Sequence, residues 1–80
     1  MMNNAMKILF FGSLTDIIGV ADLCLNGITD TDALQQFLKA QYPMLSSAKY
    51  FIAVNQKMIS ANTPLKTSDT VALMPPFSGG

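Results

Sequence analysis

The chain has 80 residues, and half of them are hydrophobic, which predicts one compact domain rather than a disordered segment. Its five basic residues are all lysines, balanced by five aspartates, and they are too scattered to form a surface for nucleic acid. The apolar stretches are too short to cross a bilayer, and no secretion signal is recognisable. A single cysteine also excludes an intramolecular disulfide. We therefore expect a cytoplasmic protein that binds no membrane.

The first part of the chain is expected to form two strands. Residues 1–5 are interpreted as a disordered leader, because the hydrophobic pattern begins at Met6. Residues 7–11 are apolar and either β-branched or aromatic, which is typical of a strand. Residues 12–19 are predicted to be a connecting loop, and residues 21–25 a second strand.

A helix is expected next, since the spacing of the apolar residues changes to steps of three and four. The positions that share this spacing are Leu34, Phe37, Leu38 and Tyr42. Asp30 or Thr31 is a suitable N-cap, and Pro43 is expected to end the helix after about 11 residues.

The rest of the chain is predicted to hold three further strands. We expect them at residues 50–55, 57–60 and 71–74, with a tight turn at Asn55 and Gln56 between the first two. A polar loop is expected to connect the second of these strands to the last one.

This order of elements predicts an α+β fold of the β-grasp kind. A hairpin, a helix crossing one sheet face and further strands would give a mixed sheet of four to five strands with one main helix packed on it. The first and last strands would lie side by side and parallel at the centre of the sheet. The domain is expected to cover residues 6–76, and residues 77–80 to form a flexible C-terminal tail.

The helix can cover one face of this sheet, so alternation along the strands decides which residues lie on the other face. The helix side receives Ile8, Phe10, Ile52, Val54, Ile59, Val71 and Leu73. The opposite side receives Leu9, Phe11, Met58, Ala72 and Met74. Such a side is normally polar in a sheet with one wet face. These residues are either scattered apolar residues of the kind that soluble proteins tolerate, or a docking face for another protein.

Few residues offer catalytic chemistry. The chain has no histidine and one cysteine, and its aspartates are dispersed, so neither a metal site nor a nucleophile paired with a base is expected. No glycine-rich phosphate loop is present. Cys24 is interpreted as a small, half-buried hydrophobic residue of a strand, because no positive charge or helix N-terminus lies near it in the sequence.

The C-terminus is the strongest candidate for a working group. Pro75 and Pro76 cannot donate to a strand ladder and should hold an extended exit from the last strand. The tail then ends in Gly79 and Gly80, which have no side chains and could thread into a narrow channel of another protein. A carboxylate is a poor electrophile, so the carboxylate of Gly80 would need activation, for instance as an acyl-adenylate.

Several runs of the sequence resemble the small subunits of molybdopterin synthase, a family of ubiquitin-like sulfur carriers. They are residues 6–11, 53–56 and 64–65 and, most specifically, the ending Val-Ala-Leu-Met-Pro-Pro-Phe-Ser-Gly-Gly at residues 71–80. The resemblance extends over residues 6–80. It implies that the protein is the non-catalytic sulfur-carrier subunit of a sulfurtransferase, active only together with a large subunit.

The resemblance also implies a reaction sequence. An E1-like adenylyltransferase would use ATP to adenylate Gly80, and a sulfur donor would convert the product to a thiocarboxylate. The carrier would then dock on the large subunit in a 2:2 heterotetramer and deliver its sulfur to cyclic pyranopterin monophosphate. No cofactor is expected to bind to the carrier itself.

The same resemblance assigns roles to residues. The residues expected to enter the large subunit with Gly80 are Phe77, Ser78 and Gly79. The residues expected to contact a partner are Phe11, Met58, Met74, Pro75 and Pro76. Three alternatives stay open: a carrier for thiamine or cysteine synthesis, a ubiquitin-like protein modifier, and a regulatory interaction domain whose tail is inert.

Overall fold

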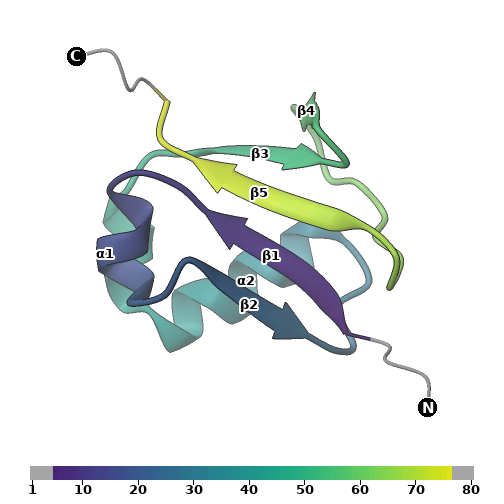
Figure 1. Ribbon diagram of the computed structural model, residues 1–80, viewed down its shortest axis with the longest axis horizontal. Helices are drawn as coiled ribbons and strands as arrows, with labels where there is room; N and C mark the ends of the chain where they lie inside the picture. Colours follow the sequence, from purple (N-terminus) through teal and green to yellow (C-terminus); the bar gives the residue numbers. More distant parts are fainter. Residues whose placement is uncertain (1–4, 77–80) are drawn as a thin grey trace.

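The computed structural model describes residues 5–76 of the chain (Figure 1). Of the predicted disordered leader at residues 1–5, residues 1–4 lie outside these residues, and so does the predicted flexible tail at residues 77–80. The elements, in chain order, are β1 (Met6–Phe10), α1 (Leu14–Ile18), β2 (Asp22–Leu25), α2 (Thr31–Gln41), the 3-10 helix η1 (Pro43–Ser47), β3 (Phe51–Val54), β4 (Lys57–Ile59) and β5 (Thr70–Met74).

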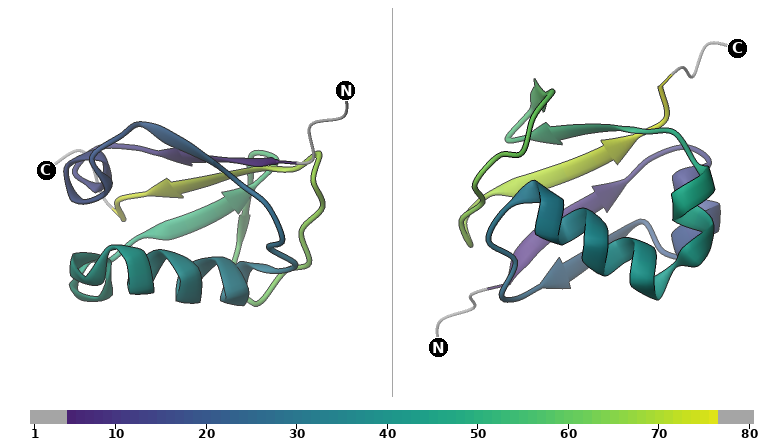
Figure 2. Two further views of the ribbon diagram at one scale, coloured as in Figure 1. Left: turned by 90° about the horizontal axis from the view of Figure 1, so that it is seen from below. Right: turned by 180° about the vertical axis from the view of Figure 1, so that it is seen from behind.

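The five strands form one mixed sheet in the order β2-β1-β5-β3-β4. β1 and β5 are parallel at its centre, with Lys7 opposite Thr70 and Phe10 opposite Leu73. The other neighbouring strands pair antiparallel. α2 crosses one face of the sheet, and the two layers are seen edge-on in Figure 2. The predicted α+β β-grasp fold, with its central parallel pair, is therefore confirmed.

The core lies between the sheet and α2, where strand alternation predicted it. Of the seven residues assigned to the helix side, five are buried: Ile8, Phe10, Ile52, Val71 and Leu73. Val54 and Ile59, nearer the open edge of the sheet, are half-buried and pack against this core. From the other layer, Leu34 and Leu38 of α2 are fully buried. The period-two pattern of the strands thus specifies the two faces of the sheet.

α2 begins and ends as the sequence predicts. Asp30 is the N-cap, and its Oδ1 accepts a hydrogen bond of 2.8 Å from the backbone N–H of Ala33. Phe37, one of the four apolar residues with helical spacing, lies at the margin of the packed face, and 38% of its surface is exposed. Phe37 lies about 100° around the helix axis from Leu38, at the edge of the arc that meets the sheet.

Two short helices correct the sequence reading. Residues 12–19, predicted to be a loop, contain α1, which buries Leu14 and Ile18 at one end of the core. It stops at Gly19, whose φ of 93° is the left-handed conformation that glycine adopts readily at a helix end. Pro43 does end the main helix, but it also starts η1, which buries Leu45.

Candidate functional site

The face of the sheet opposite α2 carries a shallow apolar hollow of about 690 Å³. All five residues that alternation assigned to this side line it: Leu9, Phe11, Met58, Ala72 and Met74. The remaining lining residues are Ala53, Asn55, Gln56 and Thr70. We call this set of nine residues the outer face. Phe11 and Met58 are 46% and 56% exposed, so large apolar side chains stand at the surface here.

The strand register explains why this face is hollow. Leu9 lies opposite Ala72, Ala72 opposite Ala53, and Ala53 opposite Met58, in a row across four strands. Two alanines therefore occupy the middle of the row, with a larger side chain at each end. Small residues between large ones leave a concave surface that an apolar side chain of a partner can fill.

A second row of this face lies near the point where the chain leaves the sheet. Met74, at the end of β5, is opposite Phe51 of β3. The backbone N–H of Phe11 donates to the carbonyl of Leu73 at 3.1 Å, so Phe11 also lies at this end of the sheet. Pro75, which follows, is half-buried, and Pro76 is exposed. Large apolar side chains thus surround the base of the C-terminal tail.

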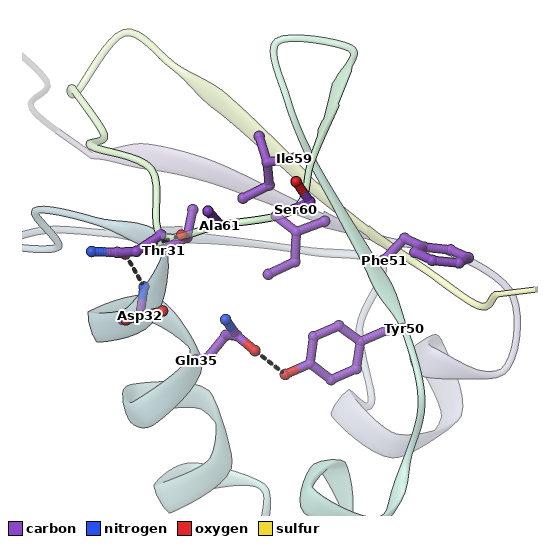
Figure 3. A pocket seen from close by; sticks show the side chains of 10 residues that line it. Thr31, Asp32, Gln35, Tyr50, Phe51, Ile59, Ser60 and Ala61 are labelled. Carbon is purple, nitrogen blue, oxygen red and sulfur yellow. Dashed lines mark hydrogen bonds between the residues drawn. The ribbon is translucent and has the colours of Figure 1, made fainter.

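The sequence analysis missed Phe51, which is 43% exposed. Its neighbour Ile52 faces the helix, and strand alternation alone places Phe51 on the opposite side. Figure 3 shows its ring directed away from Gln35 and Tyr50 of the helix side.

A polar network closes the other end of the outer face. Asn55 and Gln56 form the predicted tight turn between β3 and β4, with φ values of 51° and 70°. The Asn55 side chain donates from Nδ2 to Asp69 Oδ1 at 2.8 Å and accepts at Oδ1 from the Thr70 N–H at 3.0 Å. The Lys66 N–H donates to Asp69 Oδ2 at 2.8 Å. The bond from Asn55, followed by the bond from the Lys66 amide, holds the pKa of the Asp69 carboxyl below its ordinary value.

A smaller cleft of about 240 Å³ lies on the helix side, between the start of α2 and the β3–β4 hairpin (Figure 3). Its polar side chains bond to one another: Tyr50 donates from its hydroxyl to Gln35 Oε1 at 2.8 Å. Asn62 Oδ1 accepts from the Asp32 N–H at 2.8 Å and from the Thr31 hydroxyl at 3.2 Å. These bonds cap α2 and occupy its first turn, so we assign the cleft a structural role.

Cys24 does not lie where the sequence analysis expected it. Its side chain is exposed, on β2 at the edge of the sheet and opposite Lys7, rather than half-buried. Leu23 and Leu25 face the helix, so alternation turns Cys24 to the other side of this edge strand, where none of the elements within residues 5–76 covers it. Among residues 5–76, no cluster of three acidic, cysteine or histidine side chains could hold a metal ion. None of the helices in this part of the chain is long and apolar enough to cross a membrane.

The sequence of the chain is similar to a family model and to sulfur carrier subunits from other organisms. The sequence model of the ThiS family matches residues 8–80. The chain is 37% identical to a molybdopterin synthase sulfur carrier subunit from Dictyostelium discoideum, over 99% of this chain and 100% of that protein. It is 34% identical to the subunit of the same name from Escherichia coli K12, over 92% and 98% of the two chains.

Solved structures agree on the fold. Small archaeal modifier protein 1 from Methanosarcina acetivorans superposes with a TM-score of 0.74 at 27% identity, covering 95% of this chain and 96% of that one. A chain from the complex of subunits 1 and 2 of the molybdopterin-converting factor of Helicobacter pylori 26695 superposes with a TM-score of 0.71 at 26% identity, covering 95% and 99%.

Proposed function

Since this chain belongs to the ThiS family, we propose that it is a sulfur carrier in molybdenum cofactor biosynthesis, the small subunit of molybdopterin synthase. The observation that carries this proposal is its identity of 37% and 34% to two sulfur carrier subunits over nearly the whole length of each. The protein is then the carrier subunit of an enzyme, and this subunit contributes no catalytic side chains. The sequence offers no histidine that could serve as a general base.

The carboxylate of Gly80 would be the group that is loaded. One of its oxygens attacks the α-phosphate of ATP in an E1-like adenylyltransferase, and pyrophosphate leaves. A hydrosulfide equivalent from a sulfur donor then attacks the acyl carbon and expels AMP, which leaves a thiocarboxylate. Because Gly79 and Gly80 are glycines, neither has a side chain that could hinder attack at that carbon.

The second half of the reaction takes place in the large subunit. The thiocarboxylate sulfur is transferred to cyclic pyranopterin monophosphate, and water supplies the oxygen that returns Gly80 to a carboxylate, which can be loaded again. Two such deliveries make the dithiolene of molybdopterin. In the proposed 2:2 heterotetramer the catalytic side chains come from the large subunit, and the tail of residues 77–80 enters it. The ATP belongs to the activating enzyme, and no cofactor binds to the carrier.

The outer face is the proposed docking surface for the large subunit. It presents Phe11, Met58 and Met74 around a floor of alanines, and its second row lies beside the base of the tail. A partner that fills the hollow would therefore also receive the chain as it leaves at Pro75 and Pro76. The similarity to a chain from a complex of two molybdopterin-converting factor subunits supports a large subunit as the partner.

A second candidate function is protein modification through Gly80. It is favoured by the structural similarity to small archaeal modifier protein 1. Both functions begin with adenylation, but the product differs, because a modifier forms an amide with a lysine whereas a carrier holds sulfur. Carriers for thiamine or cysteine synthesis would share the thiocarboxylate and differ in the acceptor.

Mass spectrometry of the whole protein tests these functions. After incubation with the E1-like enzyme, ATP and a sulfur source, a carrier gains about 16 Da, because sulfur replaces oxygen. Addition of the large subunit and cyclic pyranopterin monophosphate should then return the mass to its starting value and produce molybdopterin. Absence of any ATP-dependent gain would overturn the carrier function. Loading followed by no transfer to the pterin would point to another pathway.

A further inference from the structure

Asn55 and Asp69 connect two segments that border the outer face from different parts of the chain. Asn55 belongs to the turn between β3 and β4, and Asp69 to the loop before β5. We infer that these two residues are positioning residues for partner docking: their hydrogen bond fixes the β3–β4 turn against the start of β5 and so sets one wall of the hollow. This inference rests on the proposed docking of the outer face.

Asn55 suits this position in both backbone and side chain. Its φ of 51° lies in the left-handed region, which asparagine enters more readily than most residues. Its backbone N–H donates to the carbonyl of Thr70 at 2.8 Å, and its side-chain Oδ1 accepts from the N–H of Thr70 at 3.0 Å. The side chain thus substitutes for a backbone carbonyl and continues the β3–β5 ladder one residue beyond the pair Val54–Val71.

Asp69 holds the other side of this connection. One carboxylate oxygen accepts from Asn55, and the second accepts from the backbone N–H of Lys66. The backbone N–H of Asp69 in turn donates to the carbonyl of Lys66 at 3.0 Å, which closes the loop on itself. Bonds to a charged acceptor are stronger than bonds between neutral groups, so the carboxylate holds both the loop and the turn firmly.

The connection matters for docking because it anchors the turn that leads into β4, whose other contacts are its pairing with β3 and the packing of Ile59 against the core. β4 is an edge strand of three residues and pairs with β3 alone. It carries Met58, which is 56% exposed and belongs to the outer face. Asn55, Gln56 and Thr70 line the same hollow. If the turn were released from β5, Met58 and Gln56 would therefore move away from the positions in which they line the hollow for a docked partner.

The test compares Asn55→Ala with Asn62→Ala. Asn62 also makes two side-chain hydrogen bonds, but it caps α2 and does not line the outer face. The measurements are the affinity for the purified large subunit by calorimetry and the melting temperature of each variant. Asn55→Ala should weaken binding by about tenfold, whereas Asn62→Ala should bind as the unaltered protein does. The melting temperature should fall further in Asn55→Ala, because alanine is strained at a φ of 51°. Equal affinities for both variants would overturn the inference.

A charge exchange between the two positions gives the second arm. Asn55→Asp places two carboxylates together, and Asp69→Asn removes one acceptor, so each change alone should weaken binding. The double variant Asn55→Asp/Asp69→Asn restores one donor and the required acceptors, and should bind within about threefold of the unaltered protein. Failure of the double variant to recover would show that the bond between these residues is not the cause.

A partner-free measurement separates this inference from the proposed function. In the isolated protein, hydrogen exchange at the amide of Thr70, which donates to Asn55 Oδ1, should be faster in Asn55→Ala than in Asn62→Ala. If the unaltered protein fails to bind the large subunit, the docking proposal is wrong, whereas unchanged exchange in Asn55→Ala would show that Asn55 does not hold the turn.

Discussion

Pro75 lies directly against Gly12: a Cβ atom on Gly12 would stand 2.7 Å from Cγ and 3.4 Å from Cδ of the proline ring. Gly12 has a φ of 57° and follows the end of β1, where the N–H of Phe11 bonds to the carbonyl of Leu73. The central parallel strands therefore remain in contact up to the point where the tail begins. Absence of a side chain at Gly12 lets the proline sit there, and this contact fixes where the chain leaves the sheet.

The substitution Gly12→Ala tests this contact, with Gly19→Ala as its control. Gly19 has a φ of 93° but nothing within 4 Å of its would-be Cβ, so its substitution adds backbone strain without a clash. Urea unfolding should show a loss of about 1 kcal/mol for Gly19→Ala and a larger loss for Gly12→Ala. Gly12→Ala should also slow sulfur transfer to the pterin at saturating large subunit. Equal behaviour of both variants would show that the contact with Pro75 is unimportant.

The substitution Phe11→Asp should abolish binding to the large subunit while the domain stays folded. Phe11 is 46% exposed on the outer face, so a charge there is solvated in the free protein and must be desolvated in the complex. Phe37→Asp is the matched control, because Phe37 is 38% exposed on α2, on the other side of the sheet. Calorimetry should show binding lost by at least about 100-fold for the first variant and retained for the second. Unfolding of Phe11→Asp, seen by circular dichroism, would instead make Phe11 a core residue.

The sequence specified the outer face because a strand has a period of two. Since Ile8 and Phe10 face the helix, Leu9 between them must face the opposite side of the sheet. In the structure, the strand register then places Leu9 in one row with Met58. The sequence did not reveal elements that are too short to show a repeating pattern, or properties that depend on neighbouring elements. α1 has five residues, fewer than two helical turns, so its buried Leu14 and Ile18 give no recognisable repeat.

Exposure was the other property that the sequence could not supply. Cys24 was expected to be half-buried, but what covers a residue depends on which strand lies at the edge of the sheet, and β2 does. Nor does residue spacing show that Asn55 and Asp69, 14 residues apart, are hydrogen-bonded. The Gly79-Gly80 ending, by contrast, is readable at once, because its chemistry depends on no fold.

The stability of the domain should fall in acid through Asp69. The hydrogen bond from Asn55 and the backbone bond from Lys66 lower the pKa of this carboxyl in the folded state. A group with a depressed folded pKa contributes stability above its unfolded pKa, and this contribution is lost as the pH falls from about 4 through the folded pKa. Urea unfolding should therefore show a loss for Asp69→Asn that is large at pH 7 and shrinks below about pH 4. A loss that is the same at both pH values would contradict this role of the carboxylate.

Replacement of the exposed Cys24 should leave sulfur loading unchanged. This experiment distinguishes the two groups that could carry sulfur, the thiol of Cys24 and the carboxylate of Gly80. Cys24 lies opposite Lys7, level with Thr70 at the start of β5, whereas the chain leaves the sheet after Met74 at the other end. Cys24→Ser should thus gain about 16 Da with the activating enzyme, ATP and a sulfur source, as the unaltered protein does. Deletion of Gly80 should prevent the gain. A gain of about 32 Da that disappears in Cys24→Ser would instead identify a persulfide on the cysteine as the carried sulfur.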